Sequence, residues 1–156
     1  MSEQNISSHL SIEIDLLFDN KKLDTLKYLG ILYQVKIKRK NSKLNVEELL
    51  YYYTMLYYET NNIKTPLIYK YLRDKKRINE LIIYLENLKF IQVHGDVTSR
   101  LNRLQLSITE CGVQAVESLQ SDSTLKYFEY TSHIIEKYPY RNKNSEFQNL
   151  LYIGEF

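Results

Sequence analysis

The sequence predicts a mainly α-helical protein with one small β-hairpin, and three observations support this fold class. Glycine and proline are scarce, with four and two residues in a chain of 156, which disfavours a fold rich in tight turns. Apolar residues recur at gaps of three and four along several segments, as in amphipathic helices. Two short apolar segments flank a polar, glycine-containing loop, which indicates a hairpin. The length suits a single domain over residues 1–156.

Residues 22–60 are predicted to form the N-terminal helices. Leucines spaced by three predict a helix from Lys22 to about Val35, and the basic segment KIKRKNSK after it is expected to be a solvated loop. Asn45 is a suitable N-cap for a second helix, which carries carboxylates in its first turn and runs to about Glu59. That helix is apolar or aromatic on nearly all sides, so we expect it to be buried on more than one side.

Residues 65–119 are predicted to form the core unit. Thr65 and Pro66 can start a short helix over about 66–72, and Asp74 can cap a longer one from Lys75 to Leu88. Alternating residues on both sides of a loop at about 94–102 predict the hairpin. Thr109 then caps a helix that runs to about Leu119.

Residues 123–156 are predicted to be a C-terminal helix and tail. The helix spans about Ser123–Lys137 and ends before Pro139, because proline cannot continue a helix. The tail RNKNSEFQNLLYIGEF is polar and then apolar, which is typical of a docking peptide.

The predicted order of helix, short helix, longer helix, hairpin and helix resembles a winged helix-turn-helix with extra N- and C-terminal helices. Thr65, Leu72, Ile78, Ile82, Leu85 and Glu86 follow a rhythm similar to that of MarR- and PadR-like domains. The segment LSITECGVQAVESL (residues 106–119) resembles the L-x-L-T-x-x-G ending after the wing in those families. There Gly112 would let its helix pack closely against a neighbour, whereas Lys89 stands where the families often have glycine.

The charge distribution makes DNA a candidate partner. The net charge is only +2, but residues 64–103 carry nine basic residues and four acidic ones. In the resembled fold the recognition helix enters the major groove and the wing can reach the phosphates. The candidate nucleic-acid-binding residues are Arg73, Lys75, Lys76, Arg77, Asn79, Arg100 and Arg103. The alternative is a solvated helix face, although basic residues in a first turn oppose the helix dipole.

Tyrosine suggests a second kind of surface. The chain has 15 tyrosines and no tryptophan, and rings on several consecutive residues of one helix cannot all face the core. Tyrosine is enriched at protein interfaces. The candidate interface residues are Tyr52, Tyr53, Tyr57, Tyr127, Tyr130, Leu151, Tyr152 and Phe156. The alternative is core packing in a chain whose composition favours tyrosine.

No motif indicates catalysis, so we expect no catalytic, cofactor-binding or metal-binding residue. The sequence lacks a glycine-rich phosphate loop, an H-E-x-x-H motif and a nucleophile elbow. Cys111, the single cysteine, is expected to be small and buried, and His133 is expected to form a surface pair with Glu136. With neither a signal peptide nor an apolar span, we expect a cytoplasmic protein without a membrane segment.

Two functions remain open. In the first, the chain is a non-catalytic adaptor, because its size, its domain order and the helix LNVEELLYYYTMLYYE before the winged helix are similar to those of the middle components of three-component Lamassu-type anti-phage systems. That similarity implies an SMC-like ABC ATPase and an effector as protein partners, with DNA as a possible further ligand. In the second, the chain is a homodimeric transcription regulator of MarR or PadR type that reads two operator half-sites.

Overall fold

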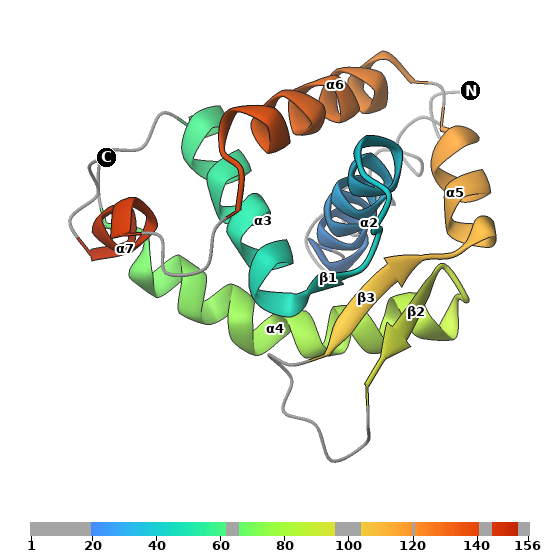
Figure 1. The fold of residues 1–156 in the computed structure, drawn as a ribbon, viewed down its shortest axis with the longest axis horizontal. Helices are drawn as coiled ribbons and strands as arrows, with labels where there is room; N and C mark the ends of the chain where they lie inside the picture. The colour runs from blue at the N-terminus through green and yellow to red at the C-terminus, as the bar shows by residue number, and fades with distance from the viewer. Residues whose placement is uncertain (1–19, 62–65, 96–103, 120, 141–144, 153–156) are drawn as a thin grey trace, which may run out of the picture.

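The computed structural model describes residues 20–61, 66–95, 104–119, 121–140 and 145–152. Within them the element order is α2 (Asn20–Lys38), β1 (Leu44–Asn45), α3 (Val46–Asn61), α4 (Ile68–Asn87), β2 (Ile91–His94), β3 (Gln105–Ile108), α5 (Glu110–Glu117), α6 (Asp122–Lys137) and α7 (Ser145–Tyr152). Figure 1 shows α4 and α6 on opposite sides of the molecule, with α2 and α3 between them. The predicted fold class, mainly helical with a small sheet, is confirmed.

The sheet contains the predicted hairpin and a third, very short strand. β2 pairs with β3 in antiparallel fashion, with Ile91 opposite Ile108, and β1 pairs with the other edge of β3, with Leu44 opposite Leu106. The strand order is therefore β1-β3-β2. Leu44 directly follows the segment that was expected to be a solvated loop, and its side chain is fully buried. This arrangement of helices and sheet is compatible with a winged helix.

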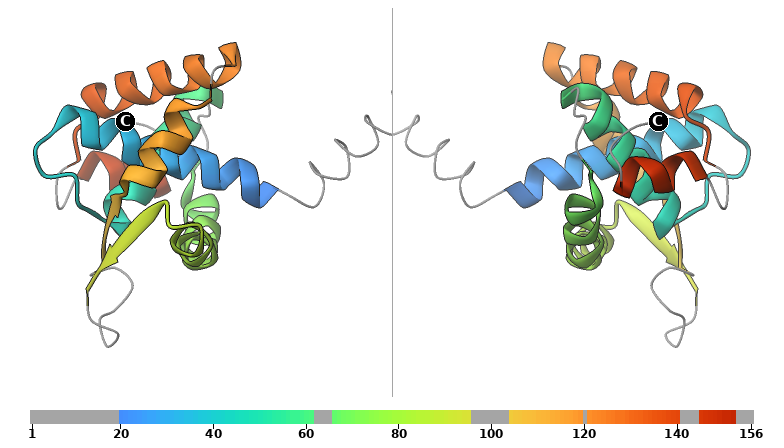
Figure 2. Two further views of the ribbon diagram at one scale, coloured as in Figure 1. Left: turned by 90° about the vertical axis from the view of Figure 1, so that its right-hand side faces the viewer. Right: turned by 90° about the vertical axis from the view of Figure 1, so that its left-hand side faces the viewer.

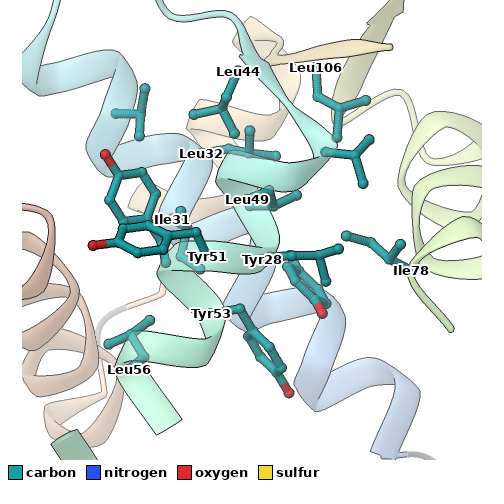
Figure 3. Close-up of a cluster of buried hydrophobic side chains, with 14 of the residues drawn as sticks. Tyr28, Ile31, Leu32, Leu44, Leu49, Tyr51, Tyr53, Leu56, Ile78 and Leu106 are labelled. Carbon is teal, nitrogen blue, oxygen red and sulfur yellow. The ribbon is translucent and has the colours of Figure 1, made fainter. Parts of the chain in front are cut away.

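The core lies where α2 and α3 meet the inner side of α4 and the sheet. Figure 3 shows side chains from these elements packed together, including Leu32, Leu49, Ile78 and Leu106, none of which is more than 1 % exposed. The helices over residues 22–60 therefore supply much of the core, rather than preceding a core formed by residues 65–119 alone. The prediction that α3 is buried on more than one side is confirmed, because eight of its residues from Val46 to Leu56 are buried hydrophobics.

Three predicted features of the backbone are confirmed by contacts. The Asn45 side chain accepts a hydrogen bond from the Glu48 backbone N–H at 2.7 Å, and the Thr109 hydroxyl accepts one from Gly112 at 3.1 Å. A Cβ added to Gly112 would lie 2.3 Å from the carbonyl oxygen of Phe90. Glycine is therefore what lets α5 lie directly against the start of β2.

Lys89 takes the backbone conformation that glycine takes most easily. Its φ is +64°, in the left-handed region, at the turn between α4 and β2. A residue with a Cβ adopts this conformation at a cost of about 1–2 kcal/mol. The Thr109 hydroxyl donates to the Lys89 carbonyl at 2.6 Å and holds the turn against the start of α5.

The predicted break between a short helix and a longer helix is wrong. α4 is one continuous helix from Ile68 to Asn87, and Asp74 lies inside it instead of capping it. Lys70 pairs with Asp74 at 2.6 Å, an i,i+4 ion pair that supports the helix through the expected break. The predicted helices over residues 22–35, 109–119 and 123–137 are found with slightly different ends, and α7 is a helix in the segment expected to be a tail. No helix among the described residues has the length and apolar character needed to cross a bilayer.

Candidate interaction surfaces

The outer face of α4 carries most of the described residues proposed to bind DNA. Ile78, Leu81, Ile82 and Leu85 form the buried face of the helix. The exposed candidates on α4 are Arg73, Lys75, Lys76, Arg77 and Asn79. Because α4 begins at Ile68, these residues lie beyond its first turn, so the expected conflict with the helix dipole does not arise. Arg100 and Arg103 lie outside the described residues.

Two basic residues of α4 are engaged inside the protein. A terminal nitrogen of Arg77 lies 2.9 Å from a carboxylate oxygen of Asp24 on α2. The other carboxylate oxygen of Asp24 accepts a hydrogen bond from the Tyr53 hydroxyl, also at 2.9 Å. Lys70 pairs with Asp74, and its ammonium lies 4.6 Å from the centre of the Tyr53 ring. Arg77 and Lys70 therefore help to hold α4 to α2 and α3.

Burial shifts the titration of groups in this cluster. The carboxyl of Asp74 has a raised pKa, mainly because it is removed from water, although the nearby Lys70 ammonium opposes the shift. Burial likewise raises the pKa of Tyr53, and the neighbouring Asp24 carboxylate adds to the effect. The rings of Tyr53 and Tyr28 are stacked with their centroids 4.4 Å apart, and Figure 3 shows the two side chains next to each other. The junction of α2, α3 and α4 is therefore partly polar and hydrogen-bonded.

Exposed apolar side chains also occupy the outer face of α4. Tyr69 is 80 % exposed, Leu72 45 % and Ile83 52 %. At about 100° per residue these three positions fall within roughly 60° around the helix axis. In Figure 2, where α4 is seen nearly end-on, β2 lies on the same side of the molecule as α4, away from α6. Sequence analysis did not select these residues, although their position off the buried stripe was a usable signal.

The outer face of α4 also carries nearly balanced numbers of basic and acidic residues. With Arg77 and Lys70 paired internally, Arg73, Lys75 and Lys76 remain as exposed basic residues, alongside exposed Glu80 and Glu86. A DNA-binding surface gains most of its affinity from neutralising phosphates. The described part of this face therefore combines apolar side chains with a small excess of positive charge. We call the face formed by Tyr69, Leu72, Arg73, Lys75, Lys76 and Ile83 the α4 surface.

Four of the tyrosines proposed for an interface meet at a pocket. Tyr53 and Tyr57 of α3 and Tyr127 and Tyr130 of α6 line a cavity of about 360 Å³, which also borders α2. The Tyr127 hydroxyl donates to the backbone oxygen of Lys27 at 2.9 Å. The structure therefore brings together residues about 70 positions apart in the sequence. We call this cavity the aromatic pocket.

The remaining interface candidates divide by burial. Tyr52, Tyr53 and Leu151 are no more than 8 % exposed, so the prediction that they present a free interface does not fit the structure. Burial also raises the pKa of Tyr52 to about 12. Tyr57 and Tyr127 are half-buried, Tyr130 and Tyr152 are exposed, and Phe156 lies outside the described residues.

Leu151 is buried because α7 docks on α3 and α4. The Phe147 ring packs edge-on against Tyr51 and Tyr71, with centroid distances of 4.9 and 5.7 Å. Part of the predicted docking peptide therefore packs against other helices of the same chain.

The other polar candidates have different surroundings. Cys111 is exposed, so its predicted burial is wrong. His94 Nε2 lies 2.8 Å from the Ser107 hydroxyl across the hairpin, and burial lowers the pKa of His94. Glu136 pairs with Lys38. In the part of the chain that the structure describes, no three His, Cys, Asp or Glu side chains are grouped so that they could hold a metal ion.

Comparison of the chain with protein-family models, with curated proteins and with solved structures finds no match.

Proposed function

We propose that this chain is a non-catalytic adaptor that binds partner proteins through the α4 surface. The observation that carries the proposal is the exposure of Tyr69, Leu72 and Ile83 on one side of the helix. Exposed apolar side chains grouped together are typical of interaction sites, and tyrosine contributes strongly when such sites are buried. The neighbouring basic residues favour a partner surface with acidic residues around an apolar centre.

The proposed partners follow from the layout of the sequence. Aromatic helices precede the hairpin unit and an aromatic segment follows it, a layout similar to that of the middle components of Lamassu-type anti-phage systems. We therefore propose an SMC-like ABC ATPase and an effector as the proteins that the chain connects. Fold alone does not determine function, so the test must use the α4 surface itself.

Co-purification of the chain with the products of adjacent genes tests this proposal. A Tyr69→Ser, Ile83→Ser variant is expected to lose its partners while its thermal unfolding stays within about 2 °C of the original, since exposed sites contribute little to stability. Ile37→Ser is the matched control, because Ile37 is 60 % exposed at the end of α2. Unchanged co-purification of the double variant, or equal loss in the control, would contradict the proposal.

The second candidate function is a homodimeric DNA-binding regulator. It is favoured by an architecture compatible with a winged helix and by the exposure of Arg73, Lys75 and Lys76 on the helix that would enter the major groove. A combined change of these three residues to glutamine is expected to lower DNA affinity and to flatten its dependence on salt by about one unit per lost phosphate contact. A stable homodimer that protects one palindromic site would favour this function over the adaptor.

A further inference from the structure

We propose that the aromatic pocket between α2, α3 and α6 binds a small amphipathic carboxylate, with a medium-chain acyl body and an anionic head. This function is separate from protein binding at the α4 surface. It is carried by the shape of the pocket, the fixed positions of its rings and the two basic residues in its lining.

The dimensions of the pocket suit a small molecule. Its volume of about 360 Å³ lies within the usual range for ligand sites. The lining residues of α3 extend from Tyr53 to Thr60, which spans roughly 10 Å at 1.5 Å per residue. That is the length of a medium-chain acyl group.

Two of the tyrosines that line the pocket use their hydroxyls in hydrogen bonds to other parts of the protein. The Tyr53 hydroxyl donates to Asp24, and the Tyr127 hydroxyl donates to the Lys27 backbone oxygen. The Lys70 ammonium lies 4.4 Å from the centre of the Tyr57 ring, a cation–π contact that fixes this ring too. Rings held in this way offer their carbon surfaces to a ligand without further ordering, which lowers the cost of binding.

Two basic side chains supply charge complementarity. Lys27 of α2 and Lys126 of α6 line the pocket, and among the described residues neither is in an ion pair. The smaller pocket of about 220 Å³ between α2, α4 and α5 has no basic residue in its lining, which makes it a useful comparison. The combination of an apolar pocket and two such lysines favours an anionic amphiphile over a neutral one.

Calorimetric titration of the full chain with decanoate, below its micelle concentration, tests the proposal. We expect saturable binding that is at least tenfold tighter than binding of decanol. A Lys27→Gln, Lys126→Gln variant is expected to lose this preference, with decanoate affinity falling at least tenfold and decanol affinity unchanged. Lys126 is exposed and Lys27 is half-buried, and the Lys27 backbone oxygen that accepts from Tyr127 is retained in the variant.

A blocking variant and two controls complete the experiment. Ser123→Phe places a ring at the edge of the pocket and is expected to abolish decanoate binding, whereas Ala115→Leu in the comparison pocket leaves it intact. Tyr69→Ser, Ile83→Ser at the α4 surface is also expected to bind decanoate normally, so the two proposals fail independently. Absence of saturable binding, equal affinity for decanol, or retention of binding in Ser123→Phe would overturn the ligand proposal. The ligand proposal would also be overturned if the original chain does not bind decanoate and the Ser123→Phe variant loses a partner protein.

Discussion

Replacing Arg77 by alanine separates a structural role from a DNA-binding role. Arg77 contacts Asp24 at 2.9 Å, and the Asp24 side chain is only 15 % exposed. The variant would leave that carboxylate with its hydrogen bond from the Tyr53 hydroxyl but without the guanidinium. We therefore expect the Arg77→Ala chain to be less stable, whereas a purely DNA-binding arginine could be removed without this cost.

The expected loss can be estimated from the environment of the pair. An exposed ion pair contributes about 0–1 kcal/mol, and a hydrogen bond to a charged group about 1.5–3 kcal/mol. The Arg77 side chain is 42 % exposed, so solvent screening places the loss between these ranges, at about 1–2 kcal/mol. For a chain of this size that corresponds to a fall in Tm of roughly 2–8 °C. Alanine and arginine have similar helix propensities, which adds little to the difference.

Urea unfolding of Arg77→Ala and Lys76→Ala measures the effect. Lys76 is the matched control, because it is an exposed residue of the same helix, and we expect its variant to stay within about 0.5 kcal/mol of the original. A cycle with Asp24→Asn should show a coupling free energy of at least about 0.5 kcal/mol between residues 24 and 77. Equal stability of the two alanine variants, with DNA affinity lost only in Arg77→Ala, would refute the structural assignment.

Three further predictions concern the turn after α4 and the carboxyl of Asp74, which lies within α4. Gly112→Ala should lower stability by about 1–3 kcal/mol in urea unfolding, because the new Cβ would meet the Phe90 backbone; a more stable variant would contradict the close approach. Lys89→Gly should raise stability by up to about 1 kcal/mol, since relief of the left-handed conformation exceeds the added entropy of the unfolded chain, and Leu88→Gly, at φ −75°, should instead lower it. Asp74 has a raised pKa in the folded chain, so its contribution to stability is full below its unfolded value of about 4 and is lost as pH rises through the folded value. Asp74→Asn should therefore gain stability relative to the original chain as pH rises from 3 to 7, and a constant difference between the two chains over this range would show that burial does not control this carboxyl.

Local signals in the sequence predicted the helices and the hairpin because those signals act over a few residues. Asn45 and Thr109 cap helices through hydrogen bonds three residues away. The resemblance to winged-helix families predicted that residue 112 must be glycine. The structure gives the physical cause, because a Cβ at this position would meet the Phe90 carbonyl oxygen. Such features need little information about distant parts of the chain.

The errors arose where distant contacts decide the outcome. β1 has two residues, and it exists as a strand only because Leu44 and Asn45 pair with β3, about 60 residues later. Tyr51, Tyr52 and Tyr53 are consecutive in the sequence, and all three are buried because other parts of the chain pack around α3. The position of α7 on Tyr51 and Tyr71 depends on tertiary packing in the same way.

The continuity of α4 changes the interpretation of its basic residues. Asp74 was interpreted as the start of a helix, which placed Lys75, Lys76 and Arg77 together in a first turn directed at DNA. Because α4 begins at Ile68, these residues lie beyond its first turn, and they point in different directions because successive helical residues are about 100° apart. Arg77 is directed to Asp24 on α2, while Lys76 shares the outer face with Tyr69 and Ile83. A cluster of three basic residues in the sequence thus becomes one ion pair between α4 and α2 and two charges beside exposed apolar side chains.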